Sequence, residues 1–346
     1  MQRVSVAAQP CEPEGALAAT GATQFGASEF EASALEAPRP SVEARPAVNA
    51  PASFAARARD IVALTKPRIT TTVALTAFGG YWLGTRWFGQ APAVESYGPM
   101  LLGTALVVSG ANALNMYLER DSDRLMRRTA SRPLPAGRLS PDVALALGLL
   151  LSAVSVPLLT FAVKPMTGLL AAVALLSYVL AYTPLKRRSS LSLLVGAVPG
   201  AIPPLIGWSA LRGTLDGPGL VLFGTMFLWQ VPHFLAIATF RRAEYARAGL
   251  QVATVVYGER TVRHQIVRYT AAMVLTSLLL VPYGLGGNLY LYTALGLGGV
   301  FFGVGAWGLR AGTGERWAKW LFLVSMIYLV GLFVALSVGR DAWQLG

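Results

Sequence analysis

Oxygen-bearing side chains recur at the end of one long apolar stretch, with the spacing of a single helix face. Asn115, Glu119 and Asp123 are four residues apart, so on a helix their side chains lie along one face. Carboxylate and amide oxygens are the ligands that a hard cation such as Mg²⁺ prefers. Polar groups at the end of a membrane span are costly, which favours a functional interpretation. The segment therefore predicts a Mg²⁺ site.

Basic residues directly follow these oxygen ligands. Arg127, Arg128 and Arg132 carry planar guanidinium groups that match the oxygens of a phosphate. Metal and phosphate ligands are thus adjacent in the chain, which predicts a site for a metal-bound diphosphate. The alternative is that Glu119, Asp121 and Asp123 only neutralise a basic loop through surface ion pairs, each worth less than about 1 kcal/mol.

A second polar segment lies inside a later apolar stretch and begins with Trp229. Gln230 and His233 lie about two turns inside that stretch, where a histidine is a functional candidate. The alternative for His233 is a side chain that only hydrogen-bonds a neighbouring helix. Glu244, in the loop that follows, is either a further metal ligand facing the first cluster or one more interfacial charge.

The composition excludes an ordinary soluble domain. Of the 346 residues, 54% are hydrophobic and only 13% are charged, whereas about a quarter are charged in a typical soluble domain. The net charge of +12 raises nucleic acid, an anionic membrane surface or an acidic substrate as a partner, and the long apolar runs disfavour nucleic acid. Cys11 is the only cysteine, which excludes an intrachain disulfide and a cysteine metal site.

Apolar stretches of about 18 to 24 residues alternate with short polar breaks, and each is long enough to cross a hydrocarbon core of about 30 Å as a helix. We therefore expect an all-α polytopic membrane protein, a bundle of about nine transmembrane helices. The expected spans are residues 69–88, 98–118, 141–162, 166–183, 191–211, 218–240, 264–284, 288–309 and 317–338.

The distribution of basic residues predicts the orientation. With the N-terminus inside, Lys and Arg concentrate in the inner breaks, and the outer side holds only Arg86, Lys164, Arg212 and Arg340. Because basic residues in short loops resist translocation, the expected topology is N-in and C-out. Both predicted polar loops then lie at the cytoplasmic face.

Residues 1–56 precede the first span and are rich in Ala, Pro, Glu and Ser. They show no helical apolar stripe and cannot bury enough apolar surface to offset the entropy lost on ordering. We expect a disordered arm, either a regulatory or interaction tail or a solvated extension without a specific role. Residues 57–346 are expected to form one membrane domain.

Several motifs occur together in a fixed order. The pattern N-D-x-x-D-x-x-x-D is matched by Asn115, Glu119 and Asp123, with Met116 in place of an acid and Glu119 in place of Asp. In these features the chain resembles the UbiA-type intramembrane prenyltransferases, over about residues 60 to 338. Other members of the family carry R-T-x-x-R-P after this motif, which is present here at residues 128–133. Four further segments resemble the haem-modifying branch of the family: L-T-K-P-R (64–68), R-P-L-P-A-G-R (132–138), P-P-L-I-G-W (203–208) and W-Q-x-P-H-F (229–234).

Two positions depart from the pattern of that branch. The second loop carries Glu244-Tyr245 where the branch usually has Asp-Tyr, which keeps the carboxylate on a longer stem. After Gly249 the chain reads Leu-Gln-Val-Ala in place of the usual Pro-Met-Leu-Pro run. The departures concern the shape of this loop more than its chemistry.

The resemblance implies a defined reaction and set of ligands. A farnesyl group would pass from farnesyl diphosphate to a vinyl group of haem b, with addition of water, in a bacterial plasma (inner) membrane. Neutralising the leaving diphosphate and excluding water are the physical requirements of that step. The resemblance assigns Mg²⁺ and catalysis to Asn115, Glu119, Asp123 and Glu244, diphosphate binding to Lys66, Arg128, Arg132 and Lys186, and acceptor binding to Trp229, Gln230 and His233.

Two other functions and one partner class stay open from the sequence. A prenyltransferase for a quinone-type aromatic acceptor would use the same diphosphate site, but the W-Q-x-P-H-F and L-T-K-P-R segments argue against it. A transporter is disfavoured because the charges collect at one membrane face, away from the midplane where transport sites usually lie. A downstream haem-modifying enzyme or a terminal oxidase assembly is a possible partner.

Overall fold

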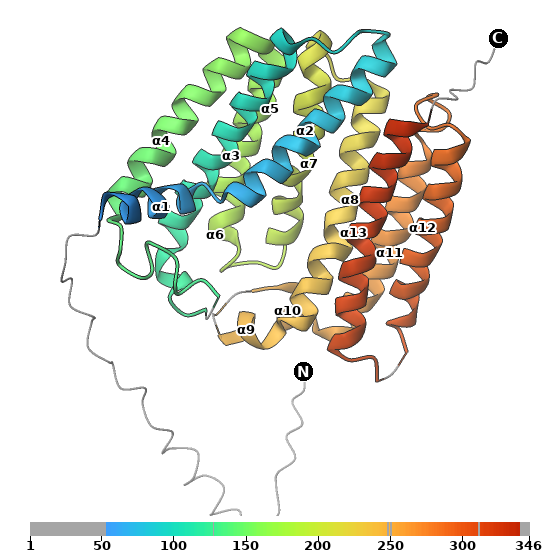
Figure 1. Ribbon diagram of the computed structural model, residues 1–346. Coiled ribbons are helices and arrows are strands. Elements are labelled where there is room, and N and C mark those ends of the chain that lie inside the picture. The colour runs from blue at the N-terminus through green and yellow to red at the C-terminus, as the bar shows by residue number, and fades with distance from the viewer. Residues whose placement is uncertain (1–52, 127, 248, 250, 311, 340–346) are drawn as a thin grey trace, which may run out of the picture. The chain divides into compact units, whose positions relative to one another are not determined.

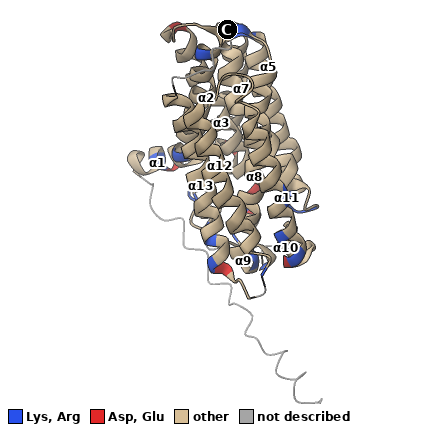
Figure 2. Cartoon of the chain, turned by 90° about the vertical axis from the view of Figure 1, so that its right-hand side faces the viewer, with Lys and Arg blue, Asp and Glu red and all other residues tan. Residues whose placement is uncertain are grey.

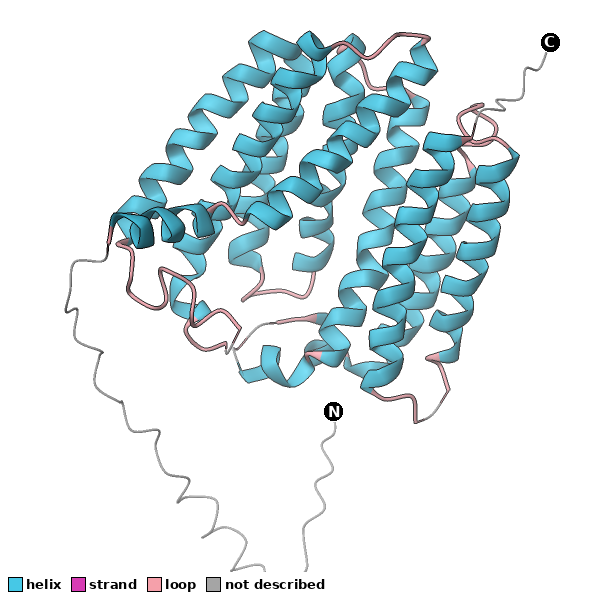
Figure 3. Ribbon diagram, in the orientation of Figure 1, coloured by secondary structure: helices cyan, strands magenta, loops and turns pink. Residues whose placement is uncertain are grey.

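The computed structural model describes residues 53–126, 128–247, 249, 251–310 and 312–339. The predicted arm lies outside the described residues except at its last four positions, where the first helix begins. The regular elements of the described part are all helices, joined by loops, and this part contains no strand (Figure 3).

The helices of the first half are α1 (Phe54–Leu64), α2 (Pro67–Phe88), α3 (Val94–Asp123), α4 (Pro141–Pro157), α5 (Pro165–Leu176), α6 (Thr183–Leu185) and α7 (Ser192–Arg212). Two π-helical segments, η1 (Leu158–Val163) and η2 (Ser177–Tyr182), continue α4 and α5. The second half holds α8 (Gly217–Phe240), α9 (Arg242–Arg247), α10 (Ala253–Val256), α11 (Gly258–Leu278), α12 (Asn288–Trp307) and α13 (Glu315–Val338).

A long helix occupies each expected span, and the described residues contain seven helices that are long and apolar enough to cross a membrane. Those seven are α3, α4 with η1, α5 with η2 and α6, α7, α8, α12 and α13. The helix expected at residues 264–284 instead runs from Gly258 to Leu278. Its first turns contain basic residues, which a search for apolar stretches does not assign to the span. It ends at Leu278, four residues before Pro282, and proline has no N–H to donate to the carbonyl at that spacing.

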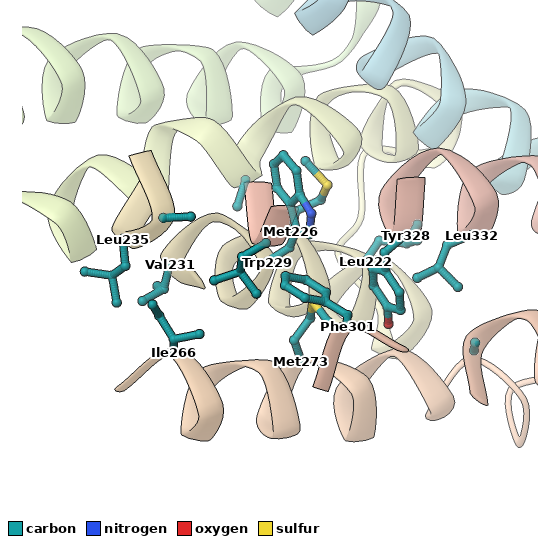
Figure 4. Packing of buried hydrophobic residues seen from close by; sticks show 14 of the residues in the cluster. Leu222, Met226, Trp229, Val231, Leu235, Ile266, Met273, Phe301, Tyr328 and Leu332 are labelled. Atoms are coloured by element: carbon teal, nitrogen blue, oxygen red, sulfur yellow. The ribbon is translucent and has the colours of Figure 1, made fainter. Parts of the chain in front are cut away.

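Two apolar cores hold the bundle together. The first lies among α2, α3, α5 and α7, and the second among α8, α11, α12 and α13 (Figure 1). Figure 4 shows part of the second core, where Trp229 of α8 lies near Met273 and Phe301. In water, burying apolar surface stabilises a fold by roughly 25 cal/mol per Å². In lipid this hydrophobic driving force between helices is missing, and close van der Waals packing stabilises the bundle instead.

Close backbone approach fixes α2 against α7. A Cβ atom on Gly80 would overlap the carbonyl of Pro204, and one on Gly207 would overlap the carbonyl of Ala77. Small residues at such crossings let membrane helices pack tightly. This crossing holds the helix that begins immediately after Lys66.

The connecting loops meet at one end of the bundle. Figure 1 shows α9 and α10 at the same end as α6 and the C-terminal end of α3. The amide of Gln251 donates to the carbonyl of Lys186 at 3.1 Å, and Met126 packs against Tyr245 and Val252. Figure 2 shows charged residues mostly towards the ends of the long helices. Three loops that are distant in sequence therefore form one polar end.

Candidate functional site

Helix α3 carries the predicted oxygen ligands on a single unbroken helix, as their spacing predicts. Asn115 and Asp123 are 2% and 1% exposed, and the Glu119 side chain is 15% exposed. Buried carboxylates are costly unless they are paired or bind a cation. Each of these side chains accordingly has a polar partner from another segment.

Lys66 reaches this helix from a strained backbone position. It is the only described residue other than glycine with positive φ, at 46°, and it links α1 to Pro67 at the start of α2. Such a conformation costs about 1–3 kcal/mol and is typical of functional sites. The Nζ atom donates to Oδ1 of Asn115 at 3.1 Å. Burial, and then the charge of Arg132, lower the pKa of Lys66 to about 8, so the site favours an added anion.

The other end of the Asn115 amide is also held. Its Nδ2 atom donates to Oγ1 of Thr183 at 3.2 Å, and that hydroxyl donates to the carbonyl of Tyr178 at 2.8 Å. Tyr178 lies in the π-helical segment η2, a geometry that is frequent at functional sites. These bonds orient the amide so that its oxygen faces Lys66.

Two ion pairs join the carboxylates of α3 to bases of two different loops. Lys186 Nζ lies 2.9 Å from Oε1 of Glu119, and Arg132 Nη1 lies 2.7 Å from Oδ2 of Asp123. The Lys186 ammonium also lies 4.6 Å from the centroid of the Tyr182 ring. Each ion pair uses one carboxylate oxygen, so both acids keep a second oxygen for another ligand.

Glu244 lies on α9, across from the loop that follows α3. Its Oε2 atom is 3.0 Å from Nη1 of Arg241, and its Oε1 atom is 4.0 Å from Nε of Arg128. The pair with Arg128 brings the two predicted polar loops together. Both oxygens of Glu244 face a guanidinium group, in contrast to the acids of α3.

Each carboxylate of this end is paired with a basic side chain. Across the described ranges, no group of three or more His, Cys, Asp or Glu residues is arranged to hold a metal ion. Ion pairing explains this geometry, because Lys186 and Arg132 neutralise the acids in a poorly solvated region. The donor chemistry of Asn115, Glu119 and Asp123, two carboxylates and an amide oxygen on one face, still fits a hard cation.

The polar residues of α8 face other helices. The indole of Trp229 donates to the carbonyl of Ser325 at 2.7 Å, and Nδ1 of His233 lies 2.8 Å from the hydroxyl of the same residue. The Trp229 and His233 rings stack at 4.6 Å. Gln230 donates to the carbonyls of Ala197 and Met226, each at 3.1 Å. For Nε2 of His233, no hydrogen-bond partner is found in the described part of the chain.

The structure thus joins eight predicted residues into one polar end and keeps three apart from it. The first set is Lys66, Asn115, Glu119, Asp123, Arg128, Arg132, Lys186 and Glu244, and the second is Trp229, Gln230 and His233.

Sequence reasoning missed three partners in this end of the bundle. Thr183 holds the Asn115 amide, Tyr182 lies under the Lys186 ammonium, and Arg241 pairs with Glu244. Thr183 and Tyr182 lie at the end of the fourth expected span, three and four residues before Lys186, and their nearness to a residue assigned by resemblance could have indicated them. For Arg241 the sequence indicates only that it is one of many basic residues expected on the inner side of the membrane.

Comparison with known proteins adds independent information. A family model described as the UbiA prenyltransferase family matches residues 73–327. A Sorangium cellulosum protein named protoheme IX farnesyltransferase is 57% identical over 77% of this chain and 99% of its own length. A protein of the same name from Myxococcus xanthus is 49% identical over 82% of this chain and 95% of its own length.

Solved structures support the fold alone. A structure described as digeranylgeranylglyceryl phosphate synthase has a TM-score of 0.71 and 17% identity, covering 82% of this chain and 98% of that one. A UbiA homologue from Archaeoglobus fulgidus bound to GPP and Mg²⁺ has a TM-score of 0.56 and 16% identity, covering 81% of this chain and 100% of its own.

Proposed function

Because this chain belongs to the UbiA prenyltransferase family, we propose that it transfers a farnesyl group from farnesyl diphosphate to a vinyl group of haem b, with addition of water, giving haem O. The observation that carries this proposal is the 57% identity over 99% of a relative named protoheme IX farnesyltransferase. The polar end of the bundle supports the use of a diphosphate substrate.

The diphosphate is proposed to bind Lys66, Arg128, Arg132 and Lys186. Lys66 has no carboxylate partner among the described residues, and its pKa is lowered to about 8 by burial and then by Arg132. A polyanion placed there relieves the repulsion between these cations. When the diphosphate binds, Lys186 and Arg132 exchange part of their contact with Glu119 and Asp123 for phosphate oxygens. An ammonium has three N–H donors and a guanidinium has five, so each side chain has further donors for the substrate.

Asn115, Glu119, Asp123 and Glu244 are the residues that would hold Mg²⁺. In support, both acids of α3 keep one oxygen outside their ion pairs. When bound, Mg²⁺ supplies charge neutralisation for the departing diphosphate. The chain itself orients the substrate through Lys66 and Lys186 and excludes water within the bundle, which protects an allylic cation from early capture.

The acceptor side is proposed to involve His233, Gln230 and Trp229. His233 is 8% exposed and uses only Nδ1 within the described residues, so Nε2 is the atom available to a ligand. Gln230 and Trp229 hold α8 against α7 and α13 through their own hydrogen bonds. Their proposed contribution is to fix the position of His233.

The finer topology belongs to the same proposal: nine transmembrane helices, N-in and C-out, in a bacterial inner membrane with the site at the cytoplasmic face. The concentration of basic residues in the loops at the polar end supports this orientation. The product, a farnesylated haem, would pass to a haem-modifying enzyme or a terminal oxidase assembly.

The test is to express the full chain in membranes supplied with haem b, farnesyl diphosphate and Mg²⁺, and to analyse the extracted haems by chromatography and mass spectrometry. A quinone precursor offered in parallel separates the acceptor classes. The proposal expects farnesylated haem and its loss when the divalent cation is chelated. A folded protein that prenylates only the quinone precursor, or neither acceptor, would overturn it.

A further inference from the structure

One exposed face of α11 carries a basic stripe followed by apolar residues. Arg260, His264 and Arg268 are four residues apart and exposed, and we call them the α11 basic stripe. Towards the C-terminal end of α11 the same face continues with the exposed side chains of Leu275 and Leu279. The face therefore has a cationic part and an apolar part along one line.

The contacts of the neighbouring Arg263 indicate how deep in the membrane the α11 basic stripe lies. Arg263 donates to the carbonyls of Gly308 and Arg310, just beyond the C-terminal end of α12, and its guanidinium lies 5.5 Å from the ring of Trp317 at the start of α13. Helices α12 and α13 are both apolar enough to cross a membrane. Because Arg263 contacts the end of α12 and the start of α13, it lies at the level where the apolar segments of these two helices begin. Tryptophan is enriched at that level.

Arg268 lies deeper than this level. It is five residues further along α11, which corresponds to about 7.5 Å of helix rise. The polar interface on each side of a bilayer is only about 5–7 Å thick. An exposed guanidinium at this depth is expensive unless a counter-charge meets it, and Arg268 forms no salt bridge with a described residue.

The three basic members differ from Arg263 in their partners. Arg263 is almost fully used by carbonyl groups, Thr313 and Glu259. Arg260 also has no salt bridge within the described ranges, and its carbonyl accepts from Nδ1 of His264 at 2.8 Å, which leaves Nε2 free. Positive-inside anchoring explains basic residues at a helix end, but not one placed three turns along the helix.

We propose that this face binds one anionic phospholipid of the adjacent leaflet, with the headgroup phosphate at the α11 basic stripe and an acyl chain along Leu275 and Leu279. The long side chain of Arg268 snorkels towards the phosphate while its stem packs against lipid. An amphiphile with an anionic head matches the order of charge and apolar surface on this face. No residue of the prenyl diphosphate site takes part, so this proposal stands independently of the proposed function.

The test compares lipid retention by variants of the full-length protein. Protein is reconstituted in nanodiscs containing equal amounts of phosphatidylglycerol and phosphatidylcholine, released, and analysed by native mass spectrometry. The wild type is expected to retain phosphatidylglycerol over phosphatidylcholine by about tenfold or more, because two arginines attract the anionic headgroup. The double variant Arg260→Gln/Arg268→Gln is expected to lose this preference.

Arg316→Gln is the matched control, because Arg316 is an exposed arginine at the start of α13 that lies outside the stripe. It is expected to keep the preference. No preference in the wild type, or equal loss in both variants, contradicts the proposal. As a measurement that needs no variant, a photoactivatable phosphatidylglycerol should label α11 of the wild type. Labelling confined to other helices, or cross-linking of α11 to a protein in place of lipid, would also overturn it.

Discussion

The polar end of α3 and the polar middle of α8 both place hydrogen-bonding side chains in apolar helices, but they use different partners. On α3 the partners are charged side chains from loops: Lys186, 67 positions away, for Glu119, and Arg132, in the loop that follows α3, for Asp123. On α8, Trp229 and Gln230 donate to main-chain carbonyls. An ion pair between mobile side chains can be exchanged for substrate oxygens, whereas a bond to a packed helix backbone mainly holds the helices together.

Backbone strain shows the same difference. Lys66 adopts a positive φ of 46° beside α3, but α8 has no non-glycine residue of positive φ. The strained linker places an ammonium against Asn115, which suits binding of an anion and not packing. The contrast predicts that substitutions at the two regions affect different measured quantities.

The largest effect is expected at Asp123. Asp123→Asn removes the charge that pairs with Arg132 and that would bind Mg²⁺, and we expect the rate of product formation to fall by about 100-fold or more. The assay is haem product formed per folded protein. Asp121→Asn is the control, because that side chain is 66% exposed and pairs only weakly with Arg120 and Arg124. Comparable loss in both variants would contradict the special role of the α3 face.

The next effect is expected at Lys66. Lys66→Gln keeps a polar group beside Asn115 but removes the charge, and we expect the KM for farnesyl diphosphate to rise by roughly tenfold or more. Steady-state kinetics at saturating haem measure this change. The exposed neighbour Arg68→Gln should leave KM nearly unchanged. An unchanged KM in Lys66→Gln would exclude direct binding of the diphosphate.

A smaller effect separates acceptor binding from helix packing as the role of His233 on α8. His233→Ala removes both ring nitrogens, whereas Ser325→Ala removes only the hydroxyl that partners Nδ1. If Nε2 contacts the acceptor, His233→Ala should raise the KM for haem several-fold, and Ser325→Ala should lower the melting temperature with little change in that KM. Equal effects of the two variants on both quantities would assign His233 to packing alone.

The smallest effect is expected at Trp229. Trp229→Phe keeps an aromatic ring for stacking on His233 but deletes the donor to the Ser325 carbonyl. We expect a loss of about 1 kcal/mol in unfolding free energy and an unchanged KM for farnesyl diphosphate. Thermal unfolding in detergent measures the first quantity. A large change in diphosphate KM would mean that the two regions are coupled.

Several features could be predicted because they depend on local periodicity. The four-residue spacing of Asn115, Glu119 and Asp123 predicts one helix face, and α3 contains all three residues without a break. The positions of the long helices followed from runs of apolar residues. The prediction for α11 was displaced because that helix starts with charged residues, which an apolar pattern assigns to a loop.

The partners of these residues could not be predicted in the same way. Lys186 meets Glu119 across 67 positions of sequence, and Lys66 meets Asn115 across 49. Arg241 pairs with Glu244 at a local i,i+3 spacing, but nothing local indicates that the adjacent Arg242 pairs with Glu259, 17 positions away. Such choices depend on how the loops pack together at the end of the bundle.

The sequence by itself determined that this protein is a helical membrane bundle with a basic polar end, because hydrophobic runs and charge placement act through local spacing and through the bilayer. Only the tertiary structure decided that the α3 acids are held by bases and that the α8 histidine faces α13. The contacts of Lys186 with Glu119 and of His233 with Ser325 join segments that are far apart in the chain, and that of Arg132 with Asp123 depends on how the following loop folds back. Their energies depend on burial and distance, which are properties of the packed bundle.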